Sequence, residues 1–243
     1  MQLLISHRLD EHLVLPMNYQ YIIQSIIYRS IGEQPTYSEF VHDQGYNYMD
    51  RSYRMFVFDF LQGKYETGDG KIEFRDRVSF SVRSPEVSFI RLLKEAIEKK
   101  GINYLGQHYD DIELTLMDET LTTETLRIKM RSPISVYSTN PDTGKSYFYT
   151  PEESGFYELV NENFLRKYLA YTGVMPSSRI VLTPVMISPR DKFVTKYKGY
   201  YVSGWNGTYE LMGEPKYLDF LYQAGLGSRN SQGFGMFDVV KNA

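Results

Sequence analysis

The sequence predicts an α+β protein made of two tandem ferredoxin-like domains, each with the element order β-α-β-β-α-β. Two observations lead to this fold class. The spacing of apolar residues alternates between strand-like and helix-like segments in that order, and the same order then occurs a second time. The two halves share no matching residues, so the repeat is one of architecture. We place the first domain at residues 1–120 and the second at residues 121–243.

The first half contains all the elements of one such unit. Its clearest helix is SPEVSFIRLLKEAIEKKG, because Ser84 suits a helix cap, Pro85 suits the first turn and Gly101 ends the pattern. In chain order we expect a strand at 3–9, a helix at 18–32, strands at 54–60 and 71–82, the helix at 84–101, and a strand at 112–117.

The second half repeats the order with different residues. Its last helix has Pro215 in the first turn and Gly225 at its end. In chain order we expect a strand at 125–130, a helix at 153–171, strands at 179–187 and 196–205, the helix at 215–225, and a strand at 234–240. Residues 208–213 are expected to extend the strand at 196–205.

Composition narrows the classes of function. The chain has no Cys, which excludes disulfides and thiolate metal sites and favours a reducing cytoplasm. No signal peptide is visible at the start, and no apolar run is long enough to span a bilayer. We therefore expect a cytoplasmic protein without a membrane partner.

Charge is unevenly distributed along the chain. Residues 1–125 carry 13 Lys and Arg against 20 Asp and Glu, a net charge of −7. Residues 126–243 carry 14 against 10, a net charge of +4. Such asymmetry suggests that the basic half meets a polyanion, although chance scatter of solvated charges gives the same counts.

A glycine-rich stretch, GLGSRNSQGFG at 225–235, separates the last predicted helix from the last strand. A dinucleotide-binding fingerprint is excluded, because a helix precedes the loop and Asn230 stands where that fingerprint needs glycine. A P-loop is excluded because no Gly-Lys-Ser/Thr occurs. We expect a tightly packed loop that turns its backbone N–H groups outward to RNA phosphates, with Arg229 at its tip.

Basic residues elsewhere in the second half predict further contacts with RNA. The segment RDKFVTKYKGYY at 190–201 offers charge and aromatic rings together, although a solvated hairpin would have the same composition. Three basic residues alternate from position 127 to 131 and are expected to face one side of a strand. The predicted RNA-binding residues are Gly225, Gly227, Arg229, Gly233, Gly235, Lys192, Lys196, Lys198, Arg127, Lys129 and Arg131.

The glycine-rich stretch resembles the C-terminal signature of the CRISPR-associated repeat-cleaving endoribonucleases, the Cas6 family of the RAMP superfamily. NYQYIIQSIIYRSI at the first helix, RSPISVY at 131–137 and LYQAG before the glycines agree with it, so the resemblance covers essentially the whole chain. It implies tandem ferredoxin-like folds. It also implies cleavage of repeats in a long CRISPR transcript into guide RNAs, without a metal.

Metal-free RNA cleavage uses the 2′-hydroxyl as nucleophile and needs a base, an acid and a cation for the phosphate. His42 is the candidate acid or base. Thr36 and Glu39 form a capping-box pattern and Gly45 is a stop signal, which predicts a short helix at 37–43 with His42 in its last turn. The negative helix end favours the imidazolium. The family's catalytic His occupies the matching place, while a plain surface histidine stays an alternative.

Tyr28 and Arg54 complete the predicted catalytic set. The family often carries a catalytic Tyr in the last turn of the first helix, where this chain has Tyr28, and a half-buried packing Tyr is the alternative. Where relatives carry a Lys, this chain offers Arg51 and Arg54, and we prefer Arg54. Arg can stabilise a phosphorane but is a poor acid. We expect no metal and no cofactor.

The sequence thus predicts a metal-independent endoribonuclease that leaves a 5′-hydroxyl and a 2′,3′-cyclic phosphate. Its expected partners are CRISPR repeat RNA and proteins of a CRISPR effector complex, and a homodimer stays open. The alternative is a non-catalytic RAMP-type RNA-binding subunit of such a complex.

Overall fold

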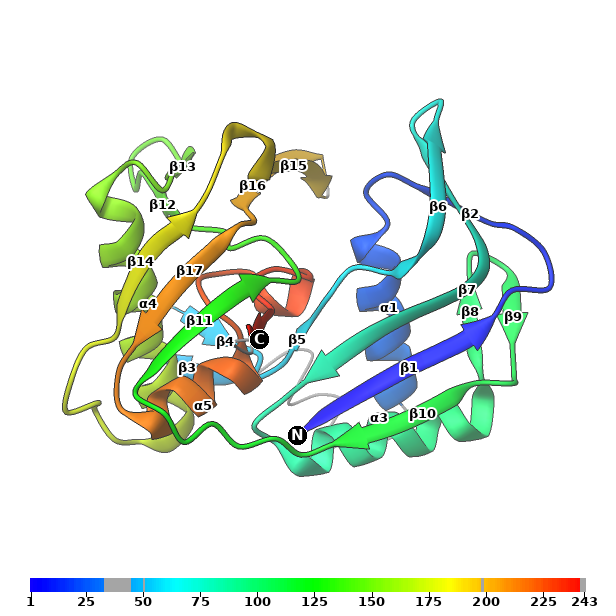
Figure 1. Cartoon of the computed structure of the whole chain (residues 1–243), viewed down its shortest axis with the longest axis horizontal. Coiled ribbons are helices and arrows are strands. Elements are labelled where there is room, and N and C mark those ends of the chain that lie inside the picture. Colours follow the sequence, from blue (N-terminus) through cyan, green and yellow to red (C-terminus); the bar gives the residue numbers. More distant parts are fainter. Residues whose placement is uncertain (33–44, 50, 198, 241–243) are drawn as a thin grey trace.

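The structure, a computed structural model, describes residues 1–32, 45–49, 51–197 and 199–240. Within these residues, two large antiparallel sheets of six and four strands dominate, accompanied by smaller two-stranded hairpins. The two large sheets lie side by side, and the long helices lie behind them (Figure 1).

The first sheet is built around the long strand β7 (Lys71–Arg83). One edge of β7 pairs with β1 (Gln2–Arg8) and β2 (Leu13–Pro16), and the other with β5 (Val57–Phe58) and β6 (Gln62–Gly68). β10 (Glu113–Met117) pairs with the free edge of β1. The spatial order β10-β1-β7-β6 is that of a ferredoxin-like unit.

Two helices cover one face of this sheet. They are α1 (Gln20–Ile31) and α3 (Val87–Lys100), which pack against each other as well as on the strands. Ile23 and Ile27 of α1 and Leu93 of α3 are fully buried in the first core. A short hairpin follows, made of β8 (Ile102–Tyr104) and β9 (Gln107–Tyr109).

The second sheet has the order β14-β17-β11-β18, again that of a ferredoxin-like unit. Its strands are β14 (Val181–Met186), β17 (Thr208–Met212), β11 (Thr125–Met130) and β18 (Phe237–Val239). Helices α4 (Ser154–Thr172) and α5 (Pro215–Ala224) cover one face. Of the helices described, none is both long and apolar enough to cross a membrane.

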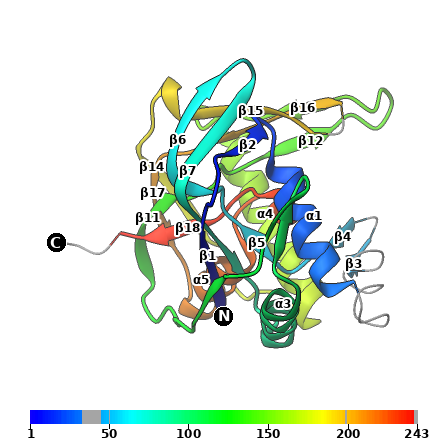
Figure 2. The same ribbon diagram turned by 90° about the vertical axis from the view of Figure 1, so that its right-hand side faces the viewer.

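Seen from the side, both sheets keep their helices on the same side of the molecule. In Figure 2, α1, α3 and α4 lie toward the right, while β11 and β18 lie toward the left. The helix side and the open sheet side are therefore two different surfaces of the protein.

Two strand predictions were wrong. The second strand of the first unit is β6, not a strand at 54–60, of which only β5 is paired with the sheet. Every residue of β6 is exposed, so it lacks the apolar pattern by which strands are recognised. The third strand of the second unit is β17, and 196–205 contributes instead to a separate hairpin of β15 (Lys192–Tyr197) and β16 (Tyr200–Trp205). Gly207, at φ +109°, turns the chain between β16 and β17.

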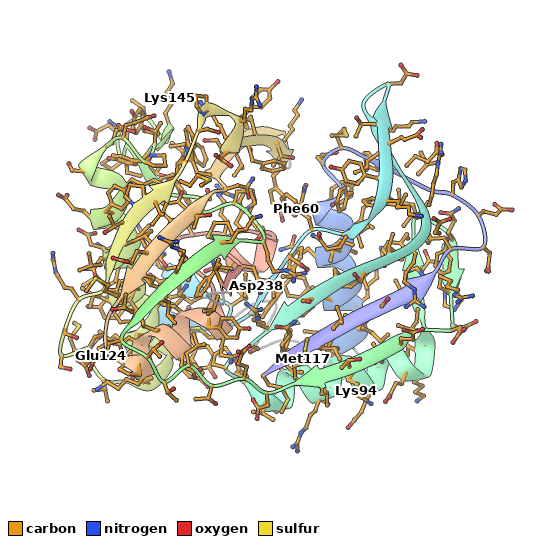
Figure 3. The ribbon with its side chains drawn as sticks, viewed as in Figure 1. Phe60, Lys94, Met117, Glu124, Lys145 and Asp238 are labelled. Atoms are coloured by element: carbon orange, nitrogen blue, oxygen red, sulfur yellow. The ribbon has the colours of Figure 1, made fainter. Side chains whose placement is uncertain are left out.

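The chain crosses from the first sheet to the second between Met117 and Glu124, both labelled in Figure 3. We propose the domain division near residue 120, within this crossing. One segment of the first half nevertheless packs into the second core. It comprises β3 (Tyr46–Tyr48), β4 (Arg51–Tyr53) and Met55, and β3 lies against α4.

A partly buried ion network joins the two sheets. Arg131 donates to Asp59, a fully buried residue that directly follows β5 in the chain. Arg131 also donates to Asp238 of β18 at 3.0 Å. Arg83 at the end of β7 donates to the other oxygen of Asp238 at 2.7 Å. Asp238 lies at the junction of the two sheets (Figure 3). Arg131 was predicted to face the same side as Arg127 and Lys129, but it follows the end of β11 and turns into this junction.

Candidate functional site

An open cleft of about 810 Å³ lies on the helix side, where the two halves of the molecule meet. Its walls come from α1, from β4 and the residue after it, from α4, from β12 (Tyr137–Thr139), from the end of β15 and from the glycine-rich loop. Among the lining residues are Tyr28, Arg51 and Arg54, together with 227–232 of the loop. Two of the three predicted catalytic residues therefore share one cleft with the loop.

Tyr28 and Arg54 are in contact. Arg54 and Ser231 of the glycine-rich loop both hydrogen-bond the Tyr28 hydroxyl. Burial raises the pKa of Tyr28, and the positive charge of Arg54 and these hydrogen bonds oppose the rise. A phenol with a raised pKa stays protonated at neutral pH, so Tyr28 is suited to donating a hydrogen bond and is a poor base. Arg54 also donates to Ser52 at 2.9 Å.

The glycine-rich loop is packed rather than open. A Cβ on Gly227 would lie 2.8 Å from the Ser135 carbonyl oxygen, and one on Gly233 would lie 2.9 Å from the Phe58 ring. Both residues have positive φ, +64° and +85°. Glycine is thus required at both positions for conformation and for space.

The predicted outward orientation of the loop amides holds only in part. The amides of Leu226, Ser228, Gln232, Gly233 and Gly235 donate to carbonyl groups of the protein. Within the described residues, no acceptor is found for the amides of Gly227, Arg229 or Ser231, all of which line the cleft. The amides that both lack an acceptor among the described residues and line the cleft therefore lie between Gly227 and Ser231.

Lys167 anchors the glycine-rich loop to α4 through hydrogen bonds. This residue of α4 is only 1% exposed, and its Nζ donates to the Gly225 carbonyl at 2.5 Å and to Asn230 Oδ1 at 2.9 Å. The Asn230 amide in turn donates to the carbonyls of Leu226 and Phe234, which ties both ends of the loop together. Burial lowers the pKa of Lys167 to about 7, while its oxygen acceptors favour the ammonium.

Arg229 is the one non-glycine residue of the loop in the left-handed region, at φ 63°. Its guanidinium lies over the Tyr137 ring, 4.7 Å from the centroid, and its Nη1 donates to Gln232 at 2.9 Å. Arg229, which was predicted at the tip of the loop, lines the cleft.

Outside the loop, the predicted RNA-binding residues that the structure describes do not line the cleft, whereas Gly227 of the loop does. Arg127 and Lys129 are exposed on the sheet face opposite the helices, because their neighbours Leu126 and Ile128 fill the second core. Lys192 and Lys196 alternate with Tyr197 along β15, so they point away from the side on which Tyr197 meets the cleft. Lys198 lies outside the described residues.

His42 and the short helix predicted at 37–43 also lie outside the described residues. The description resumes at Gly45, where an added Cβ would lie 2.7 Å from the Tyr53 carbonyl oxygen, directly before Arg54. The other three histidines are placed elsewhere. His7 is buried and bonded to Tyr104 at 3.2 Å, His12 pairs with Glu73 at 2.7 Å, and His108 pairs with Asp110 at 2.8 Å.

Sequence reasoning missed Asn163 and Lys167, two cleft residues of α4. A signal was present for the lysine. Phe156, Val160 and Phe164 form an apolar stripe with helical spacing, and Lys167 occupies the next position of that stripe. A lysine in such a stripe indicates a buried charge with a specific partner. Across the described residues, no group of three or more His, Asp or Glu side chains is arranged to hold a metal.

The C-terminal half of the chain matches a protein-family model. Residues 116–239, just over half of the chain, match the model described as "CRISPR associated protein Cas6, C-terminal". The chain belongs to the Cas6 family.

Relatives agree with this membership of the Cas6 family. The chain is 25% identical to a "CRISPR-associated endoribonuclease Cas6" of Pyrococcus furiosus, over 98% of this chain and 89% of that protein. It is 24% identical to "CRISPR-associated endoribonuclease Cas6 1" of Methanocaldococcus jannaschii, over 100% of this chain and 94% of that protein.

Solved structures show the same fold. A structure described as "Characterization of a Cas6-related gene from Pyrococcus furiosus" has a TM-score of 0.81 at 21% identity, covering 100% of this chain and 99% of that one. Another, described as "An RAMP protein binding different RNA substrates", has a TM-score of 0.82 at 21% identity, covering 99% of both chains. The predicted tandem ferredoxin-like fold is confirmed.

Proposed function

We propose that this protein is an endoribonuclease that cleaves CRISPR repeat RNA in the precursor transcript, at the cleft between α1 and the glycine-rich loop. The observation that carries the proposal is the meeting of Tyr28, Arg54 and Ser231 in one cleft of a Cas6-family chain. Two relatives covering nearly the whole chain are named as CRISPR-associated endoribonucleases. The free amides in the middle of the loop supply donors for a phosphate at the same place.

The proposed reaction is attack of a 2′-hydroxyl on the neighbouring phosphate. The P–O bond to the 2′-oxygen forms, the bond to the 5′-oxygen breaks, and the products carry a 2′,3′-cyclic phosphate and a 5′-hydroxyl. Arg54 stabilises the charge that develops on the phosphate, because its guanidinium stays cationic throughout. Tyr28 donates a hydrogen bond from its protonated hydroxyl. We assign both proton transfers to His42, whose ordinary pKa of about 6.5 suits that role: its imidazole takes the proton of the 2′-hydroxyl, and the imidazolium gives a proton to the departing 5′-oxygen.

We also propose the setting in which this reaction occurs. The protein acts in the cytoplasm and hands its product to proteins of a CRISPR effector complex. Cleavage proceeds without metal or cofactor, because His42 supplies the proton transfers, Arg54 the positive charge and Tyr28 a hydrogen bond.

The test is repeat RNA incubated with protein in EDTA and resolved on a gel. The proposal expects cleavage in EDTA at the rate seen with Mg²⁺, with a 5′-hydroxyl on the downstream fragment. A single 2′-deoxy nucleotide on the 5′ side of the cut should stop the reaction, because it removes the nucleophile. Loss of cutting in EDTA that Mg²⁺ restores would contradict the mechanism.

The same gel addresses the second candidate, an RNA-binding subunit that does not cut. One observation favours it: the basic residues that this chain offers in the cleft beside Tyr28 are the arginines Arg51 and Arg54, and arginine hardly acts as an acid. Tight binding of repeat RNA with intact RNA after long incubation would support that candidate.

A further inference from the structure

The cleft contains two buried polar groups that the fold does not use. Asn163 is only 8% exposed, yet its Oδ1 finds no hydrogen-bond partner among the described residues. The Nε of Arg229 is also buried and also has no hydrogen-bond partner among the described residues. Both residues line the cleft. Buried polar groups in proteins are almost always hydrogen-bonded. Two such groups without a partner in the same cleft therefore indicate that a ligand supplies the missing hydrogen bonds.

We propose that Asn163 and Arg229 form a recognition subsite for one unpaired base of single-stranded RNA. The inference rests on the proposed function, because it names what the cleft reads on the repeat. An asparagine amide presents one donor side and one acceptor side, which matches the donor and acceptor atoms on the edge of a base. Rotation about its Cβ–Cγ bond exchanges the two, so the amide can fit either order.

The surroundings of these two groups suit a flat ring. The guanidinium of Arg229 is already stacked on Tyr137, and unpaired RNA bases are commonly held on aromatic rings and guanidinium planes. Tyr28 and Tyr197 contribute further rings to the lining. The cleft volume of about 810 Å³ is within the range of pockets that enclose small organic molecules.

The placement of Asn163 is itself specific. It lies one helical turn before Lys167 on α4, and Lys167 is bonded to the loop that carries Arg229. Its near neighbour Asn161 is equally buried and its Nδ2 also lacks a partner among the described residues, but its Oδ1 accepts from the Ile180 amide at 3.0 Å and the residue does not line the cleft. Asn161 thus has a structural partner, whereas Asn163 faces the cleft.

The test compares Asn163→Leu with wild type on a series of repeat RNAs in which each nucleotide in turn is abasic. Binding is measured with the 2′-deoxy RNA that resists cleavage. In wild type, one abasic position near the cut should weaken binding by about 5- to 100-fold, the usual worth of a base contact. Asn163→Leu should weaken binding of the intact RNA by a similar factor and lose its sensitivity to that one position.

Thermal unfolding separates this role from a structural one. Leu is close to Asn in shape and has no polar atoms. If the Asn163 amide has no partner until RNA binds, Asn163→Leu removes an unsatisfied polar group and should keep or raise the unfolding temperature. Asn161→Ala is the matched control: it should lower the unfolding temperature and leave the abasic profile unchanged. Arg229→Lys, which keeps the charge and removes the planar group, should weaken the same position only.

The outcomes are distinct. If wild type binds no repeat RNA, the proposed function fails and the subsite fails with it. If wild type binds and cuts, but Asn163→Leu keeps the wild-type abasic profile, the subsite alone is wrong. A lower unfolding temperature with an unchanged profile would show that buried water satisfies Asn163 for structural reasons, and would also overturn the proposal.

Discussion

At the residue scale, Lys167 has the strongest electrostatic consequence in the candidate site. Its ammonium is fully enclosed, its described partners are neutral oxygens, and its pKa falls from an ordinary 10.5 to about 7. Between those two values the unfolded chain binds a proton that the folded chain has begun to release. Stability therefore rises with pH through this window, and below about pH 7 the full cost of burying the charge is present.

The expected result is a wild-type free energy of unfolding that increases from pH 7 to pH 9.5, by at most about 1.4 kcal/mol per pH unit from this group. Lys167→Met lacks the titrating group and should lose that increase. Denaturant unfolding at several pH values measures it. Equal pH slopes in both proteins would show that Lys167 stays charged, held by its oxygen acceptors.

Sequence reasoning reached the position of a side chain where a local pattern fixed it, while the catalytic roles stay predictions. Tyr28 lies in the last turn of a clearly amphipathic helix, and Arg54 follows soon after, so their shared cleft was within reach of sequence reasoning. Arg131 was misplaced because its partners, Asp59 and Asp238, are 72 and 107 residues away in the chain. No local pattern indicates an ion pair over such a distance.

At the scale of elements, strands were predicted well when one face was buried and poorly when neither was. β11 alternates exposed and buried residues, and its bounds agree with the prediction. β6 is exposed throughout and belongs to the sheet only through backbone pairing with β7, which leaves no side-chain pattern to read. The hairpin of β15 and β16 was mistaken for a sheet strand because its residues have strand propensity whichever partner they pair with.

The glycine-rich loop allows a test at this scale. Gly233→Ala places a Cβ against Phe58 at positive φ, and the left-handed conformation alone should cost about 1–2 kcal/mol of stability. If the loop presents donors to RNA, as proposed, repeat affinity should fall as well. Arg229→Ala should weaken binding and reduce the slope of log affinity against log salt by about one, with little change in stability.

The measurements are repeat-RNA affinity at several salt concentrations and thermal unfolding of each variant. Gly68→Ala is a suitable control, since an added Cβ there meets nothing within 4 Å. Wild-type affinity and salt slope in both loop variants would reduce the loop to a packing element.

At the scale of the whole molecule, the ion network of Asp59, Arg83, Arg131 and Asp238 fixes one sheet against the other. The cleft is bounded by both halves, so its shape depends on this junction. Asp59→Ala leaves Arg131 with Asp238 alone and the Ser81 amide without its side-chain acceptor, and should destabilise the protein by about 1–3 kcal/mol.

Denaturant unfolding checks this value. The exposed pair of Lys64 and Asp76 provides the comparison, and Asp76→Asn should change stability by less than about 1 kcal/mol. Similar small losses in both variants would mean that the junction is held by apolar packing rather than by the network.

The most direct measurement of the central claim is single-turnover cleavage of repeat RNA in EDTA by wild type, His42→Ala, Tyr28→Phe and Arg54→Ala, with affinity measured in parallel. If the cleft is the cleavage centre, His42→Ala should slow cleavage by about 10²- to 10⁴-fold. Tyr28→Phe and Arg54→Ala should each slow it clearly, and all three should bind RNA nearly as well as wild type. His12→Ala and His108→Ala, whose side chains lie outside the cleft, should cut at the wild-type rate. Near-normal cleavage by His42→Ala and Tyr28→Phe would contradict the account and place the chemistry elsewhere on the protein.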